Sequence, residues 1–247
     1  MNIAMILAGG TGTRVGAGVP KQFIEVQGKP IIVHTLEAFQ NCSEIDAIQV
    51  VCIASYIDVL NSLVEQYGLT KVHYVVPGGS TYQGSVINGL DALGAVCKPD
   101  DIVAIHFAAG AFVTEDIIVD SIRVAQEHGN GISSDPVVLC LAEKDAADND
   151  RSSVVGRDRD RVMGLNSPQT FRYQVLRELY DQGARQNIFE RIDPHTTSLM
   201  AALGVRLYFS KGSSLNIKIT SPEDVELFNA YLIAKATKTG APADSAR

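Results

Sequence analysis

The chain has 247 residues, of which 46% are hydrophobic and 20% charged, and it carries a formal net charge of −7. This length is sufficient for one sizeable α/β domain, and the composition is that of an ordinary globular protein. A negatively charged chain argues against a nucleic-acid partner, which would require a basic face, whereas a small phosphorylated ligand needs only local positive charge.

The four cysteines indicate the compartment in which the protein works. Cys42, Cys52, Cys97 and Cys140 show neither a CxxC motif nor the spacing of metal ligands. They are therefore expected to be reduced thiols of a cytoplasmic protein. Neither a signal peptide nor a membrane span is expected, so we predict no membrane partner.

The first half of the chain alternates strands with helices. Apolar runs predict strands over residues 3–7, 47–53, 72–76 and 101–106, and helical spacing predicts helices over 30–40, 57–67, 81–93 and 115–127. Such alternation predicts a three-layer α/β fold with a mostly parallel, Rossmann-like sheet and right-handed crossovers. Ligands of these folds bind beyond the carboxyl ends of the strands.

The second half of the chain has a looser pattern. Residues 136–142 are predicted to form a strand, and the polar stretch 143–160 to form a solvated loop or a hairpin. The remaining predicted elements are helices over 173–182, 198–203 and 222–236, the last capped by Ser221, and strands over 205–209 and 216–220. We expect one domain over 1–236 and a disordered tail over 237–247.

A glycine-rich stretch directly follows the first predicted strand. It comprises Leu7, Ala8, Gly9, Gly10, Thr11, Gly12, Thr13 and Arg14. Its backbone can approach a ligand closely, and successive N–H groups form an anion-binding nest, to which Arg14 and Lys21 add positive charge. The stretch lacks the Gly-Lys-Ser/Thr of the Walker motif and the third glycine of the dinucleotide fingerprint. It therefore predicts a nucleotide-phosphate site of another kind.

The same residues carry a resemblance to a known family. Leu7-Ala-Gly-Gly-x-Gly-x-Arg14 followed by Pro20-Lys21-Gln22-Phe23 resembles the signature of the sugar-phosphate nucleotidyltransferases. Gly28-Lys-Pro-Ile-Ile-Val-His-Thr35 is similar to the branch that contains the ribitol-5-phosphate and 2-C-methyl-D-erythritol-4-phosphate cytidylyltransferases. The resemblance implies transfer of CMP from CTP to a sugar-alcohol phosphate, with Mg²⁺ as cofactor. Pro168-Gln-Thr-Phe-Arg172 and the Leu7-Ala-Gly-Gly opening place the chain slightly closer to the ribitol-phosphate branch.

The resemblance also implies roles for individual residues. Phosphoryl transfer requires cations that stabilise the developing charge, and Arg14, Lys21 and Lys218 match the cations of the family. Lys218 would equally suit an exposed edge of a strand. Gly79 and Ser85 match the segment that binds the cytidine, although Ser85 would also suit the start of a helix.

A dimer is implied by the same family. There, the segment corresponding to residues 136–162 is a β-arm that embraces a second subunit, so a homodimer is expected. Arg159 matches an arginine that grips the acceptor phosphate across the dimer, although residues 157–161 alternate arginine with aspartate and would also suit a solvated edge. Thr196 falls where the family places an acceptor-binding element.

The chain departs from the family where a metal ligand is expected. The family pattern Ile-His-Asp-Ala-x-Arg appears here as Ile105-His-Phe-Ala-Ala-Gly110, so Phe107 replaces an aspartate and Gly110 replaces an arginine. Tyr82 replaces an arginine of another family segment. Phenylalanine cannot ligate Mg²⁺, so the metal ligands are unknown, with His106 and Asp193 as conceivable substitutes. Two hypotheses remain: an active cytidylyltransferase, or a catalytically impaired nucleotide-binding relative that serves as a scaffold or regulator.

Overall fold

The computed structural model describes residues 1–10 and 18–239. The expectations for Thr11, Gly12 and Arg14, and for the tail from residue 240 onward, lie outside the described residues. The central sheet has the strand order β11-β7-β10-β6-β1-β4-β5. Its strands are β1 (Asn2–Ala8), β4 (Ala47–Cys52), β5 (Val72–Pro77), β6 (Ile102–Phe107), β7 (Asn130–Pro136), β10 (Met163–Arg172) and β11 (Phe209–Lys211). Only β10 of this sheet is antiparallel to its neighbours.

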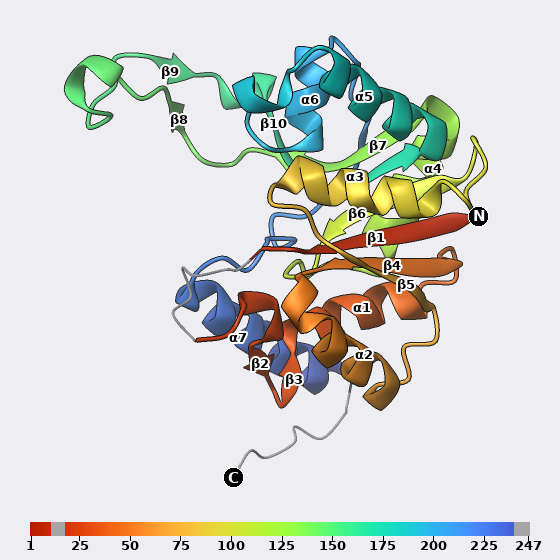
Figure 1. The fold of residues 1–247 in the computed structure, drawn as a ribbon. Helices are drawn as coiled ribbons and strands as arrows, with labels where there is room; N and C mark the ends of the chain where they lie inside the picture. The colour runs from red at the N-terminus through yellow and green to blue at the C-terminus, as the bar shows by residue number, and fades with distance from the viewer. Residues whose placement is uncertain (11–17, 240–247) are drawn as a thin grey trace.

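Helices cover both faces of the sheet (Figure 1). They are α1 (Ile31–Asn41), α2 (Ile57–Gln66), α3 (Tyr82–Leu93), α4 (Glu115–His128), α5 (Tyr173–Arg185), α6 (Thr196–Ala202) and α7 (Pro222–Thr239). Apolar residues of α1, α2 and α4 form the core on one face, and those of α3, α5 and α6 form the core on the other. The predicted three-layer α/β fold is thereby confirmed.

The C-terminal helix packs at the margin of this body. Phe228 of α7 contacts Phe112, with ring centroids 5.0 Å apart, next to the short hairpin of β2 (Glu25–Val26) and β3 (Lys29–Pro30). The Ser221 Oγ accepts a hydrogen bond from the Asp224 amide at 3.3 Å, so the predicted cap is confirmed. The helix runs to Thr239, and the prediction of a disordered tail is therefore wrong for residues 237–239. No helix in the described ranges is long and apolar enough to cross a membrane.

Two strands between residues 130 and 172, β7 and β10, were not predicted from the sequence. The strand predicted over 136–142 is wrong, because the chain leaves the sheet at Pro136 and pairs again only at Leu141–Ala142. β7 and β10 were missed because serine, asparagine, glycine and proline outnumber large apolar residues in both. Ser133 and Ser134 of β7 are buried, and their hydroxyls donate to backbone carbonyl oxygens of β11. Tertiary pairing thus overrides weak local propensity here.

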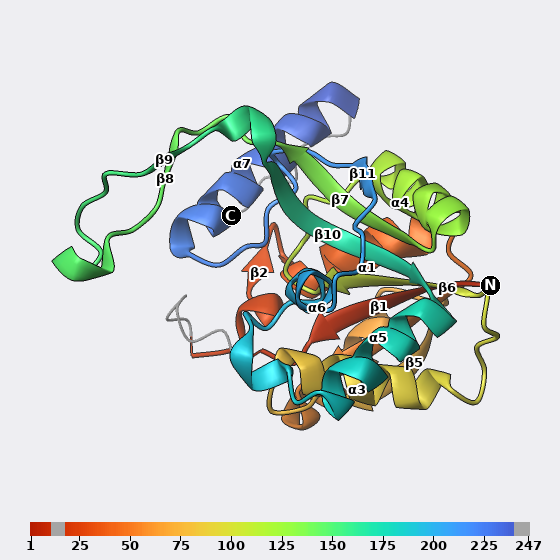
Figure 2. The ribbon, with the colours of Figure 1, turned by 90° about the horizontal axis from the view of Figure 1, so that it is seen from above.

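The segment between β7 and β10 stands away from the body (Figures 1 and 2). Strand β8 (Leu141–Ala142) pairs with β9 (Gly156–Arg157) in an antiparallel hairpin. Of the two alternatives for this stretch, a solvated loop or a hairpin, the structure therefore shows the hairpin, which forms a protruding β-arm. We call residues 137–162 the arm. It exposes apolar side chains, including Val154 at 93%.

Candidate active site

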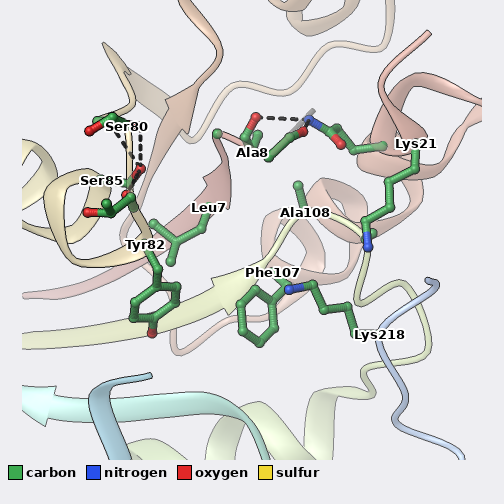
Figure 3. Close-up of a pocket in the computed structure, with 15 residues that line it drawn as sticks. Leu7, Ala8, Lys21, Ser80, Tyr82, Ser85, Phe107, Ala108 and Lys218 are labelled. Atoms are coloured by element: carbon green, nitrogen blue, oxygen red, sulfur yellow. Dashed lines mark hydrogen bonds between the residues drawn. The ribbon is translucent and has the colours of Figure 1, made fainter. Parts of the chain in front are cut away.

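A cavity of about 280 Å³ lies at the carboxyl ends of β1 and β6, beside the N-terminus of α3 (Figure 3). Its lining residues are Leu7, Ala8, Gly9, Gly10, Lys21, Gln22, Gly79, Ser80, Thr81, Tyr82, Ser85, Phe107, Ala108, Ala109 and Lys218. We call it the nucleotide cavity. Every described residue that we predicted to be catalytic or nucleotide-binding lines it.

In one wall of the nucleotide cavity, the backbone at Gly9 and the turn at Gly79 both lie close to the start of α3. A Cβ on Gly9 would lie 3.1 Å from the Ser85 Oγ, and a Cβ on Gly79 would lie 2.5 Å from the Gly84 carbonyl carbon. The Ser85 Oγ accepts from the Gly79 amide at 3.1 Å and donates to the Thr81 carbonyl at 2.9 Å. Ser85 therefore shapes the turn, and its contact with the base stays a prediction.

The glycines of this wall give a testable contrast. Gly79→Ala must shift the Gly84 backbone, so we expect it to destabilise the protein by about 1–3 kcal/mol and to weaken CTP binding. Gly10→Ala places its methyl group within 4 Å of no described atom beyond its chain neighbours, so it should keep the melting temperature. Thermal unfolding and calorimetric CTP titration of both variants test this. Equal melting temperatures for the two would contradict the steric argument.

Gln22 organises the start of the glycine-rich loop. Its side chain is buried, and its Nε2 donates to the carbonyls of Ala8 at 2.9 Å and Gly10 at 3.0 Å. The short turn at Lys21–Phe23 is thereby tied to the end of β1. Gln22 belongs to the family signature Pro20-Lys21-Gln22-Phe23, but we predicted no role for it. The sequence feature that could have indicated a role for Gln22 is its position directly after Lys21.

Two lysines enter the cavity from segments far apart in sequence (Figure 3). The Lys21 Nζ donates to the Ile219 carbonyl at 2.7 Å, and the Ile219 amide donates to the Ala109 carbonyl at 2.8 Å. This bonding fixes the backbone beside Lys218. The prediction of a strand over 216–220 is wrong, because this segment docks onto the loop after β6 without joining the sheet. The strand predicted over 205–209 also differs, since β11 begins only at Phe209.

A second cavity of about 310 Å³ adjoins the first. We call it the adjoining cavity. Phe107 and Lys218 line both, and the other residues of the adjoining cavity are Leu165, Asn166, Gln169, His195, Thr197 and Ile217. Gln169 is 5% exposed, and its Oε1 has no hydrogen-bond partner among the described residues. Amide and hydroxyl groups of this kind can bind the hydroxyls of a polyol.

Thr196 does not line either cavity. It is fully buried, and its Oγ1 lies 3.0 Å from the Tyr82 hydroxyl and 2.9 Å from the Tyr180 hydroxyl. Burial raises the pKa of Tyr82 to about 12, so this hydroxyl stays neutral. The neighbouring Thr197 lines the adjoining cavity instead. A direct acceptor contact therefore suits Thr197 better than the predicted Thr196.

The arm carries Arg159 away from the cavities of its own chain. The Arg159 Nη1 donates to the Val138 carbonyl at 2.8 Å, and Arg157 forms an ion pair with Glu143. Both arginines are exposed. Any contact of Arg159 with an acceptor phosphate would therefore have to be made in another subunit.

The described residues do not fit a carboxylate-bound Mg²⁺. They contain no group of three or more histidine, cysteine, aspartate or glutamate side chains that could hold a metal. Neither cavity has an aspartate or glutamate in its described lining, and Asp193 lines neither. Burial lowers the pKa of His106 to about 4, with the nearby charge of Lys218 acting in the same direction. The His106 Nε2 lies 2.9 Å from the Gly110 carbonyl, and His106 lines neither cavity.

Fold and site together define a nucleotidyltransferase: a mostly parallel sheet, a glycine-rich turn at the end of its first strand, and lysines that converge there. The family model for IspD, 2-C-methyl-D-erythritol 4-phosphate cytidylyltransferase, matches residues 2–234, and the chain belongs to this family. The predicted resemblance and the prediction of a cytidylyltransferase enzyme are thus confirmed.

Individual relatives cover nearly the whole chain. A ribitol-5-phosphate cytidylyltransferase of Lacticaseibacillus paracasei is 38% identical over 235 residues, which are 95% of this chain and 99% of the relative. A 2-C-methyl-D-erythritol 4-phosphate cytidylyltransferase of Clostridium perfringens is 36% identical, with coverage of 93% and 98%. The crystal structure of the Francisella tularensis IspD matches with a TM-score of 0.77 at 27% identity, with coverage of 93% and 99%.

Proposed function

We propose that this protein transfers CMP from CTP to a sugar-alcohol phosphate, with D-ribitol 5-phosphate preferred over 2-C-methyl-D-erythritol 4-phosphate. The observation that carries the proposal is the pair of cavities that meet at Phe107 and Lys218. One lies beside the glycine-rich turn, and the lining of the other includes two amides and a hydroxyl. The preference for ribitol 5-phosphate is supported by relatives of that name at 38% identity.

In the proposed reaction, CTP occupies the nucleotide cavity and the polyol phosphate occupies the adjoining cavity. An oxygen of the acceptor phosphate attacks the α-phosphorus of CTP, a new P–O bond forms, and the bond to the β-phosphate breaks to release pyrophosphate. Negative charge spreads over the transferring group, so the main task of the protein is to present cations and backbone donors. Lys21, Lys218 and Gly9 to Gly10 supply them from the described residues, and we assign Arg14 the same task.

Mg²⁺ enters this proposal only as the counter-ion that accompanies CTP. The described lining offers no carboxylate to this ion. The lysines and the backbone amides of the turn are the groups of this chain that offset the phosphate charge.

We further propose a homodimer in which each arm reaches the other subunit. Val138, Leu139 and Val154 of the arm are 71%, 70% and 93% exposed, and side chains of this kind are usually buried in an interface. Arg159 of the arm would then complete the acceptor site of the partner. Because Arg159 lines neither cavity of its own chain, this arrangement would give it a phosphate to bind.

Pyrophosphate release tests the function. With CTP and Mg²⁺, we expect steady turnover and a higher kcat/KM for ribitol 5-phosphate than for methylerythritol 4-phosphate. The reverse order would overturn the acceptor preference. CTP binding without turnover on either acceptor would instead favour the nucleotide-binding scaffold or regulator. The reason to consider this alternative is that Phe107 replaces the family aspartate.

A further inference from the structure

The boundary between the two cavities is formed by an aromatic ring and an ammonium group. The Lys218 Nζ lies 3.6 Å from the centroid of the Phe107 ring, within the range of a cation–π interaction. Both side chains line both cavities. Figure 3 shows the Lys218 amine against this ring, with Lys21 reaching toward the same region. The lysine is thus held where the two proposed substrates would meet.

The backbones that carry this pair are fixed. Phe107 ends β6 in register with Leu7 of β1, and the next residue, Ala108, donates from its amide to the Leu7 carbonyl at 3.0 Å. On the other side, Ile219 is fully buried and bonded to Ala109. The four-carbon stem of Lys218 has rotatable bonds, whose ordering costs conformational entropy.

The ring itself is supported by two other rings. The Phe107 centroid lies 6.2 Å from that of Tyr82 and 6.2 Å from that of His195, the latter nearly perpendicular at 86°. Tyr82 is in turn held by its contact with Thr196. Phe107 is therefore a fixed surface against which a flexible lysine can be ordered.

The chemistry of residue 107 decides how much charge Lys218 presents. A carboxylate at this distance would form an ion pair with the ammonium and neutralise it. An aromatic face attracts the ammonium while leaving its full positive charge for phosphate oxygens. The described linings of the two cavities contain no acidic side chain.

We propose that Phe107 is a positioning residue: its ring holds the Lys218 ammonium at the boundary of the two cavities, so that one cation contacts the phosphates of both nucleotide and acceptor. The proposal rests on the proposed function and assigns the replacement at residue 107 a role within it. The phenylalanine orders a cation in a site whose described part has no carboxylate for a metal.

Three replacements at residue 107 test the proposal by activity. Phe107→Leu removes the ring face and should lower kcat/KM by about 2- to 30-fold, mainly through kcat, while CTP affinity stays within about twofold. Phe107→Tyr should recover most of this loss. Phe107→Asp should lower kcat/KM at every Mg²⁺ concentration, because its carboxylate neutralises Lys218. Phe209→Leu, the same change on the exposed strand β11, is the control.

Two activity results would overturn the proposal. One is a Phe107→Leu variant that is folded and as active as the wild type. The other is a Phe107→Asp variant whose activity rises with Mg²⁺ above that of the wild type, because the missing carboxylate would then be what limits the reaction.

A spectroscopic test needs no turnover. The chain contains no tryptophan, so Phe107→Trp introduces a single indole at the boundary. We expect its emission maximum to shift when Lys218→Met is added, because the charge over the ring is lost. Identical spectra would overturn the proposed contact even in an active enzyme. A shift in a protein without turnover would keep the contact and reject the proposed function, so the two failures are distinguishable.

Discussion

Replacing Lys21 by alanine is expected to lower turnover by roughly 100- to 1,000-fold, the usual effect of removing one preorganised donor from a charged transition state. The side chain enters the nucleotide cavity beside the glycine-rich turn and donates to Ile219, next to Lys218. Its loss would therefore remove one cation and loosen the support of another. Steady-state kinetics and calorimetric CTP binding measure the effect.

The fold should survive this change. Loss of the hydrogen bond to the Ile219 carbonyl corresponds to about 1 kcal/mol of stability. Lys29→Ala is a matched control, because its ammonium forms an ion pair with Glu37 at 2.7 Å and lines neither cavity. A Lys21→Ala variant with full CTP affinity and full turnover would remove the basis for the site.

Mixing two impaired variants is expected to restore activity if each site takes Arg159 from the partner subunit. In a heterodimer of Lys21→Ala and Arg159→Ala chains, one site has both defects and the other has neither. Random exchange of equal amounts makes half of the dimers mixed, so the mixture should regain about a quarter of the wild-type activity. Arg159→Ala alone should lower the activity by about 10- to 100-fold, which is the effect of losing one hydrogen bond to a charged group.

The control mixture combines Lys21→Ala with Lys218→Ala. Both lysines line the cavity of the same chain, so no site in that heterodimer is intact and no activity should return. Native mass spectrometry verifies that subunits have exchanged. If heterodimers of the first pair form and remain inactive, Arg159 does not act across the interface.

The fold was predictable wherever a segment buries its own apolar pattern. β1, β4 and β6 are nearly continuous buried runs, and the helices between them carry regular apolar faces. β7 and β10 were not predictable, because their stability comes from pairing with each other and from buried serine and threonine hydroxyls. Sequence periodicity contains no signal for such strands.

The site was predictable through motif positions more than through local structure. Lys218 was expected on a strand, yet it reaches the cavity from an irregular segment fixed by Ile219. Thr197 was not predicted and Gln22 was assigned no role, because a cavity wall assembled from distant segments leaves no periodic pattern in the sequence. Conversely, Phe107 was recognised only as a missing carboxylate, and its contact with Lys218 required coordinates.

The base of the arm has a consequence for how the protein assembles. Pro136, the last residue of β7, pairs directly with Met163, the first residue of β10, so the chain leaves the sheet and returns to it at adjacent points. The entropic cost of closing such an excursion grows only slowly with its length. For the proposed homodimer, we therefore expect the body to fold first as a monomer, with the arms engaging in a later bimolecular step whose rate rises with protein concentration.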